Sequence, residues 1–191
     1  IADCDIDTID PQTYSGSSLT PDVKITYKGA LLEKGVDYEI SYSNNIAVSS
    51  GKALATITGK GKYESTVNIY FDIVPKPIFE MSFPTATAGI EYGDNLTQIP
   101  ISFSKNDYGT FVWDSSSSVP AVGTQSAQLT FIPSENTIRN YDISCIEGYD
   151  EDTLTIKRKV PITVSKRNVT ININVKGYSL DHANDKIVFN Y

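Results

Sequence analysis

The chain of 191 residues contains one histidine, one methionine, one tryptophan and two cysteines, and these small numbers exclude several kinds of site. A Ser-His-Asp or Cys-His arrangement needs a base within hydrogen-bond reach of a nucleophile, and the isolated His182 is poorly placed to serve either cysteine. One histidine and two distant cysteines do not supply the four ligands of a zinc site. We therefore interpret His182 as a surface residue. We expect Cys4 and Cys145 to be small buried side chains rather than a disulfide.

Positive charge and long apolar runs are also scarce. The 16 Lys and Arg residues are outnumbered by 23 Asp and Glu residues, which gives a formal net charge of -7 and long-range repulsion from nucleic acid and anionic lipid. No apolar run approaches the roughly 18 residues of a membrane-spanning helix, and no charged-then-apolar leader begins the sequence. We expect an acidic protein of the extracellular space or the cell surface, with no nucleic-acid partner and no membrane insertion.

Short segments with strand signals, separated by turn residues, are plentiful. They cover residues 23–27, 37–42, 53–58, 67–73, 101–103, 109–113, 127–131, 154–164 and 169–175. No segment shows apolar residues at the i, i+3, i+4 and i+7 positions of an amphipathic helix over a useful length. The sequence therefore predicts an all-β protein without a substantial helix.

The alternation in residues 67–73 predicts the kind of sheet. Its four apolar residues would share one face, and Asn68, Tyr70 and Asp72 would share the other. One apolar and one polar face are typical of antiparallel sandwiches, whereas strands of parallel sheets are apolar on both faces. Residues 127–131 alternate in the same way.

Two similar exits divide the chain, each a β-rich run followed by a lysine and a new start. We predict modules at residues 1–75 and 76–166, joined by a short, semi-rigid link, because Pro75 and Pro77 restrict the backbone. Residues 167–191 are too few for a third sandwich. We interpret them as the start of a truncated third module or as a C-terminal β extension.

Residues 14–73 closely resemble the immunoglobulin-like repeats of bacterial cell-surface and secreted proteins. The landmarks are Tyr14-x-Gly16, Thr20-Pro21, Tyr27-x-Gly29, Asp37-Tyr38, Tyr42-x-x-Asn45, a strand led by Gly51, and Gly59-x-Gly61-x-Tyr63. The chain departs from this pattern at Ser65, where such repeats often carry glycine.

Residues 85–141 look like another repeat of this kind, the MBG-like type. The landmarks are Tyr92-Gly93, Gly109 to Trp113, Pro120-x-Val122-Gly123, Phe131-x-Pro133 and Asn140-Tyr141. The resemblance implies two tandem immunoglobulin-like antiparallel β-sandwiches from an adhesin, a stalk or the non-catalytic part of a secreted enzyme. Fold analogy supports architecture better than function.

Two acidic clusters raise the question of calcium. Asp3, Asp5 and Asp7 alternate, but Thr8 stands where a calcium loop needs glycine and Tyr14 where it needs glutamate. We interpret this run as an edge strand with a charged outer face. Residues 148–153 form the second cluster, which we interpret as the tip of an extended hairpin within residues 142–164, with calcium binding as the alternative.

Aromatic residues are the remaining lead, because 12 tyrosines could supply a sugar-stacking platform or an adhesive face. Trp113 alternates with Phe111, which favours a core position over a ligand contact. Tyr70 points away from its apolar neighbours and is the candidate ligand-contact aromatic.

We therefore expect a non-catalytic spacer or adhesion module that belongs to a longer polypeptide and uses no cofactor, metal or catalytic residue. Its partners would be proteins or glycans of a host or of the cell surface. The alternative is a carbohydrate-binding accessory module of a surface enzyme, which requires two or three coplanar exposed aromatic rings.

Overall fold

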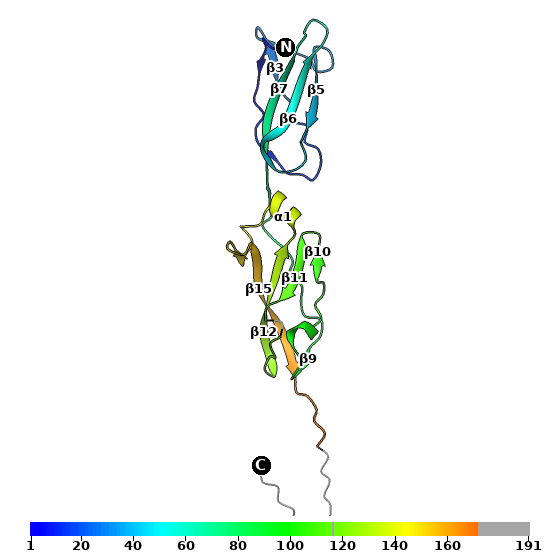
Figure 1. Cartoon of the computed structure of the whole chain (residues 1–191), viewed down its shortest axis with the longest axis vertical. Coiled ribbons are helices and arrows are strands. Elements are labelled where there is room, and N and C mark those ends of the chain that lie inside the picture. The colour runs from blue at the N-terminus through cyan, green and yellow to red at the C-terminus, as the bar shows by residue number, and fades with distance from the viewer. Residues whose placement is uncertain (116, 172–191) are drawn as a thin grey trace, which may run out of the picture.

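The computed structural model describes residues 1–115 and 117–171 and shows two lobes arranged end to end (Figure 1). We call the part that contains β1 to β7 the N-terminal lobe and the part that contains β8 to β15 the C-terminal lobe. No helix within the described ranges is long and apolar enough to cross a bilayer. The segment 167–191 lies largely outside the described residues, and so does His182.

The N-terminal lobe consists of two sheets. Its strands are β1 (Asp5–Ile6), β2 (Gln12–Thr13), β3 (Ile25–Tyr27), β4 (Ala30–Leu31), β5 (Tyr38–Ser43), β6 (Ser49–Gly59) and β7 (Thr66–Val74). One sheet has the order β1-β3-β4 and the other the order β2-β7-β6-β5. Ile25 of the first sheet and Ile57 of the second are fully buried in one apolar cluster, so the two sheets enclose a shared core.

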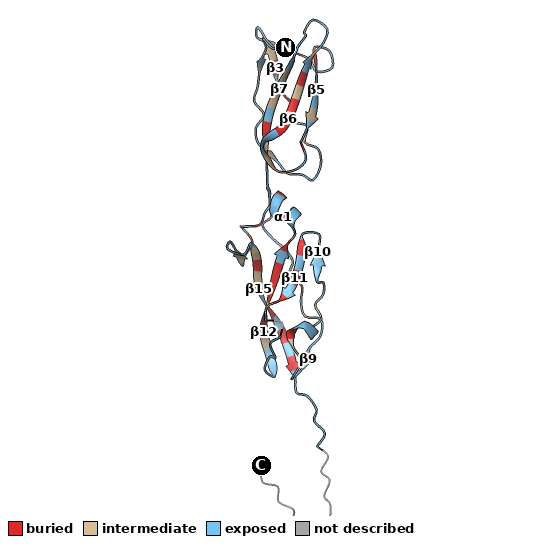
Figure 2. Cartoon of the chain, viewed as in Figure 1, coloured by how far each residue is buried: buried red, intermediate tan, exposed pale blue. Residues whose placement is uncertain are grey.

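The predicted alternation in residues 67–73 is confirmed. Phe71 and Ile73 are buried and Val67 and Ile69 are half-buried, whereas Tyr70 on the opposite face is exposed (Figure 2). The edge-strand interpretation of the first acidic run is also confirmed, because β1 is the edge of its sheet. Asp3, Asp5 and Asp7 are exposed there.

Ser65, where the chain departs from the repeat pattern, has a strained backbone conformation. Its φ is +77°, a left-handed conformation in which a Cβ atom crowds the backbone, and its carbonyl accepts a hydrogen bond from Gly59 N at 3.0 Å. Glycine adopts this φ without the crowding. The preference for glycine at this position therefore has a backbone cause.

Ser65→Gly should raise the free energy of unfolding of the N-terminal lobe by about 0.5–1 kcal/mol, because relief of the left-handed strain outweighs the added flexibility of glycine. Urea unfolding followed by NMR signals of this lobe would measure the change. Ser43→Gly in β5 is the matched control and should be destabilising. A destabilised Ser65→Gly variant would contradict the explanation.

The C-terminal lobe has one large sheet. Its elements are β8 (Lys76–Pro77), β9 (Ile90–Glu91), the 3-10 helix η1 (Leu96–Gln98), β10 (Lys105–Asn106), β11 (Gly109–Trp113), β12 (Gly123–Pro133), α1 (Glu135–Asn140), β13 (Tyr141–Asp142), β14 (Tyr149–Asp150) and β15 (Thr155–Ser165). The sheet order is β10-β11-β12-β15-β14, and β9 pairs with the end of β15. Pro161 in β15 lies opposite Ser126 of β12, between the stretches that pair with β14 and β9. A proline is tolerated where a strand lacks a second neighbour.

The inner face of this sheet carries the lobe's core, as the alternation predicts. Leu129 and Phe131 are fully buried, and Trp113 is 9% exposed, which confirms its predicted core position. The opposing layer consists mainly of irregular chain between β8 and β10, from which Leu96 and Ile99 are buried against the sheet. The predicted strand at residues 101–103 is wrong, because Ile101 forms only an isolated bridge with Ala86.

Several other expectations are corrected by local structure. The hairpin within residues 142–164 is shorter than predicted, since β15 pairs mainly with β12 and only Tyr149 and Asp150 of β14 pair back with it. The predicted strand at residues 169–175 is absent from its described part, residues 169–171. Three short pairings, β2-β7, β8-β13 and β9-β15, are parallel, although the long pairings are antiparallel as predicted.

The helix α1 is too short to give a periodic signal in the sequence. Ser134 caps it, because its Oγ accepts a hydrogen bond from Thr137 N at 3.2 Å. The all-β class is thus confirmed. The finer immunoglobulin-like assignment and the module boundaries remain predictions.

Candidate functional site

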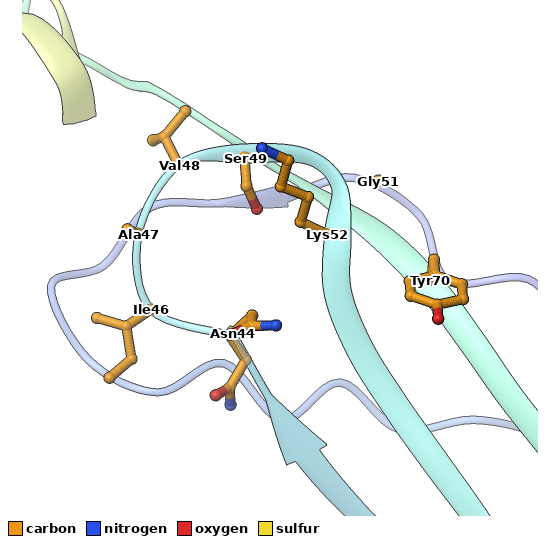
Figure 3. A pocket seen from close by; sticks show the side chains of 9 residues that line it. Asn44, Ile46, Ala47, Val48, Ser49, Gly51, Lys52 and Tyr70 are labelled. Atoms are coloured by element: carbon orange, nitrogen blue, oxygen red, sulfur yellow. The ribbon is translucent and has the colours of Figure 1, made fainter.

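An open hollow of about 640 Å³ lies where β5 connects to β6, and we call it the Tyr70 hollow (Figure 3). Its lining comes from the connection, from the start of β6 and from one residue of β7. The lining residues are Asn44, Asn45, Ile46, Ala47, Val48, Ser49, Gly51, Lys52 and Tyr70. The volume falls within the range of about 300–1,000 Å³ that is usual for ligand sites.

The two asparagines Asn44 and Asn45 turn the chain at the end of β5. Asn44 has a φ of +54°, a left-handed conformation that asparagine tolerates well. Asn45 is buried, and its Nδ2 donates to the Leu19 carbonyl at 2.8 Å while Leu19 N donates to the Asn45 carbonyl at 2.9 Å. Asn45 therefore holds the connection, whereas Asn44 is exposed at the hollow.

A change of register at the start of β6 shapes the other side of the hollow. The pairing with β7 shifts between Ser49 and Ala53, and Gly51 within this bulge has a φ of +60°. Gly51 N donates to Asp72 Oδ1 at 2.5 Å, which fixes the bulge to β7. Lys52 is thereby exposed at the rim of the hollow, where Figure 3 shows its side chain running toward Ser49.

Tyr70 lies on β7 opposite Leu54 and is 60% exposed. Its predicted exposure is confirmed, and its role as a ligand contact stays a prediction. Among the described residues that line the hollow, Tyr70 is the only aromatic one. The array of two or three coplanar rings that a carbohydrate platform would use does not form there.

Ser49 lines the hollow but does not present its hydroxyl to a ligand. Its Oγ is shielded from solvent and has no hydrogen-bond partner among the described residues. A shielded hydroxyl cannot contact a ligand in the present arrangement. The exposed residues of the hollow that carry polar side-chain groups are Asn44, Lys52 and Tyr70.

The hollow adjoins the junction between the lobes. Val48, which lines it, donates its backbone N–H to Asn140 Oδ1 of α1 at 3.2 Å. Asn140 is buried and also donates from Nδ2 to Asn136 Oδ1 at 2.9 Å. One side chain of the C-terminal lobe thus holds the connection between β5 and β6.

Three tyrosines form a second contact across the junction. Tyr14 of the N-terminal lobe packs edge-on against Tyr141, with ring centroids 5.4 Å apart, and Tyr141 packs in the same way against Tyr108 at 5.3 Å. Such edge-to-face pairs are a favourable aromatic geometry. Burial raises the pKa of the Tyr141 hydroxyl, and the neighbouring Tyr108 and Tyr14 raise it further.

The link between the lobes, residues 75–77, is flanked by a backbone hydrogen bond at each end. Tyr14 N donates to the Val74 carbonyl at 2.9 Å before Pro75, and Ile78 N donates to the Asp142 carbonyl at 2.8 Å after Pro77. Between these two points, β8 pairs in parallel with β13. We call these bonds, together with the Val48–Asn140 bond and the tyrosine contacts, the lobe junction.

The second acidic cluster forms a hairpin tip, as predicted. Lys157 Nζ donates to Asp150 Oδ2 at 2.7 Å, and the backbone N–H groups of Asp152 and Thr153 donate to Asp150 Oδ1. The hydrogen bond from Lys157 lowers the pKa of Asp150, and the same bond raises the pKa of Lys157. Within residues 1–115 and 117–171, no group of three or more His, Cys, Asp or Glu side chains could hold a metal ion.

Both cysteines are free, as expected, but neither side chain is fully buried. Cys4 is half-buried in the N-terminal lobe. Cys145 is exposed, so the prediction of a buried side chain is wrong there. It follows β13 in a turn in which the neighbouring Ile143 and Ile146 take the buried positions.

Sequence reasoning singled out Tyr70 but missed its surroundings. The bulge that exposes Lys52 has a sequence signal in Gly51, which served only as the start of a strand in the resemblance. The lobe junction had a partial signal in Asn140-Tyr141, which served only as a landmark of the resemblance. No protein-family model and no curated protein matches this chain.

Proposed function

We propose that the chain is a non-catalytic spacer or adhesion segment of a bacterial cell-surface or secreted protein. The observation that carries this proposal is the lobe junction. A spacer must hold its ends at a fixed separation, and the link is bonded to the N-terminal lobe through Val74 and to the C-terminal lobe through Ile78. A link with both ends bonded transmits orientation, whereas a flexible linker does not.

The location outside the cell and the longer parent polypeptide belong to the same proposal. They are supported by the resemblance of residues 14–73 and 85–141 to bacterial surface repeats and by the acidic net charge of -7. Host or cell-surface proteins and glycans are the proposed partners. The alternative function, a carbohydrate-binding accessory module, is supported by the exposed Tyr70 ring in its hollow, a single ring in place of the two or three coplanar rings of a flat platform.

An insertion in the link tests the spacer function. We expect a Gly-Ser-Gly-Ser insertion between Pro75 and Lys76 to let the lobes reorient independently. The reason is that β8 would stay paired with β13 of the C-terminal lobe while a flexible segment separates it from β7 of the N-terminal lobe. In the unmodified chain, ¹⁵N relaxation should give both lobes the overall tumbling of one elongated body. In the variant, both lobes should show shorter correlation times with their folds unchanged.

The same insertion after Gly61 is the matched control, because this turn lies between β6 and β7 at the end of the lobe away from the junction (Figure 1). It should leave the tumbling of the two lobes coupled. Independent tumbling in the unmodified chain would refute the spacer function.

A further inference from the structure

We propose that the Tyr70 hollow binds an acidic oligosaccharide, a glycan that carries uronic-acid carboxylates. The inference rests on the alternative function named above. It does not depend on the spacer role, which is tested by a different measurement.

The first support is the exposure of Tyr70. A tyrosine ring that stands 60% exposed on a sheet offers a flat face for the C–H groups of a sugar ring, at little cost in side-chain freedom. Its backbone is held in the pairing of β7 with β6, so the ring stands on a rigid element. A site on a strand is positioned more precisely than one on a loop.

The second support is the charge at the rim. The protein is acidic, yet Lys52 lines the hollow and forms no ion pair among the described residues. The nearby Asp72 carboxylate is occupied by the N–H of Gly51. Lys52 is therefore placed to pair with a ligand carboxylate, and such charged hydrogen bonds are stronger than neutral ones.

The third support is the form of the hollow. It is open, it is about 640 Å³ in volume, and the start of β6 lies between the loop and Tyr70 (Figure 3). A ligand that reaches both Tyr70 and Asn44 must extend across Lys52, which suits a chain of sugar units better than a single one. The amide of Asn44 can donate to and accept from sugar hydroxyls.

These features favour a glycan over a peptide. Peptide recognition in pockets relies on enclosed apolar sites that bury an anchor, whereas this hollow is open. Its aliphatic side chains, Ile46, Ala47 and Val48, lie on the connecting loop beside one ring, one cation and one exposed amide. Glycan recognition uses that combination of a ring face and hydrogen bonds to hydroxyls. Acidic peptide binding is therefore a contrary outcome of the test.

The test is an NMR titration of the full ¹⁵N-labelled chain with a galacturonate tetrasaccharide up to about 10 mM, the range of weak single-site binding. The ionic strength is about 0.15 M, at which repulsion by the net charge of -7 is screened beyond about 8 Å. We expect shifts confined to residues 44–52 and the neighbourhood of Tyr70. A neutral galactose tetrasaccharide should bind about threefold more weakly, as for an exposed ion pair.

The variants assign the contacts. Tyr70→Ala should weaken binding about five- to tenfold, and Lys52→Gln should remove the preference for the acidic glycan. Tyr92→Ala, which removes another exposed ring in the C-terminal lobe, is the matched control and should change nothing. The spectra themselves show whether each variant is folded.

Three results would overturn the proposal. They are the absence of localised shifts with the galacturonate tetrasaccharide, equal binding of the neutral glycan or of a tetraglutamate peptide, and unchanged binding by Tyr70→Ala. Each would leave the coupled tumbling of the two lobes unaffected, so the spacer function would stand or fall separately.

Discussion

Phe131→Ala is expected to lower the free energy of unfolding of the C-terminal lobe by about 3–5 kcal/mol, the usual cost of removing a large buried aromatic side chain. Phe131 is fully buried on β12, and its ring centroid lies 5.0 Å from that of Phe111. Phe111 in turn contacts Phe83 and Phe103, at 5.1 Å and 5.4 Å. Removing Phe131 would leave these rings beside a cavity that rigid β strands cannot close.

The single tryptophan makes this effect measurable in one lobe. Trp113 lies in the same buried cluster as Phe131, so its fluorescence during urea unfolding reports the C-terminal lobe alone. Ile132→Ala is the matched control, because Ile132 is the next residue on β12 and is 44% exposed. The control should cost less than about 1 kcal/mol. A similar small cost for Phe131→Ala would show that this cluster is not the core of the lobe.

Gly109→Ala is expected to lower the free energy of unfolding of the C-terminal lobe by about 3 kcal/mol or more, which is the upper range for overpacking. A Cβ atom at this position would lie 2.2 Å from the Ile132 carbonyl oxygen and 2.8 Å from ring atoms of Phe131. The first contact is with backbone, so it cannot be relieved by a change of side-chain rotamer. The strands β11 and β12 would have to separate.

Gly29→Ala separates this clash from ordinary glycine strain. Gly29 has a φ of +81°, but nothing lies within 4 Å of the position of its Cβ. Its replacement should cost about 1–2 kcal/mol, the price of left-handed backbone strain alone. Trp113 fluorescence would follow the Gly109 variant, and NMR signals of the N-terminal lobe would follow the control. Equal costs would mean that β11 and β12 are not packed as closely as described.

The strands that could be predicted from the sequence are those with one wet and one buried face. In β11 every second side chain is buried, and in β7 and the middle of β12 every second side chain is buried or half-buried, with Thr130 as a buried exception. The period of two therefore appears directly in the residues. The opposing layer of the C-terminal lobe could not be predicted in this way. Leu96 begins the three-residue helix η1 and Ile99 directly follows it, so neither residue belongs to an element long enough to show a period that relates sequence to burial.

The parallel pairings could not be predicted for a related reason. The partners β8 and β13 are each two residues long and lie far apart in sequence, so no local sequence pattern predicts that they pair. Ser65 is the opposite case, because its departure from a repeat pattern pointed to a position that the structure shows to be left-handed.

Only part of the candidate site could be predicted from the sequence. The exposure of Tyr70 follows from the alternation of β7, and the turn at Asn44 follows from its residue type. The bond between Val48 and Asn140 joins residues 92 positions apart, which requires the three-dimensional arrangement of the two lobes. The contacts of Tyr14 and Tyr108 with Tyr141 also depend on the fold, because nothing in the sequence distinguishes these three residues from the other tyrosines among the 12.

The fixed arrangement of the two lobes is the central claim, and an electron-spin distance measurement tests it most directly. Spin labels would be placed at Ser41→Cys in β5 and Lys159→Cys in β15, both exposed, with Cys4 and Cys145 replaced by serine. The lobe junction predicts one narrow distance distribution, which should broaden when Asn140→Ala and the link insertion are introduced together. A broad distribution in the chain with an intact junction would contradict the account.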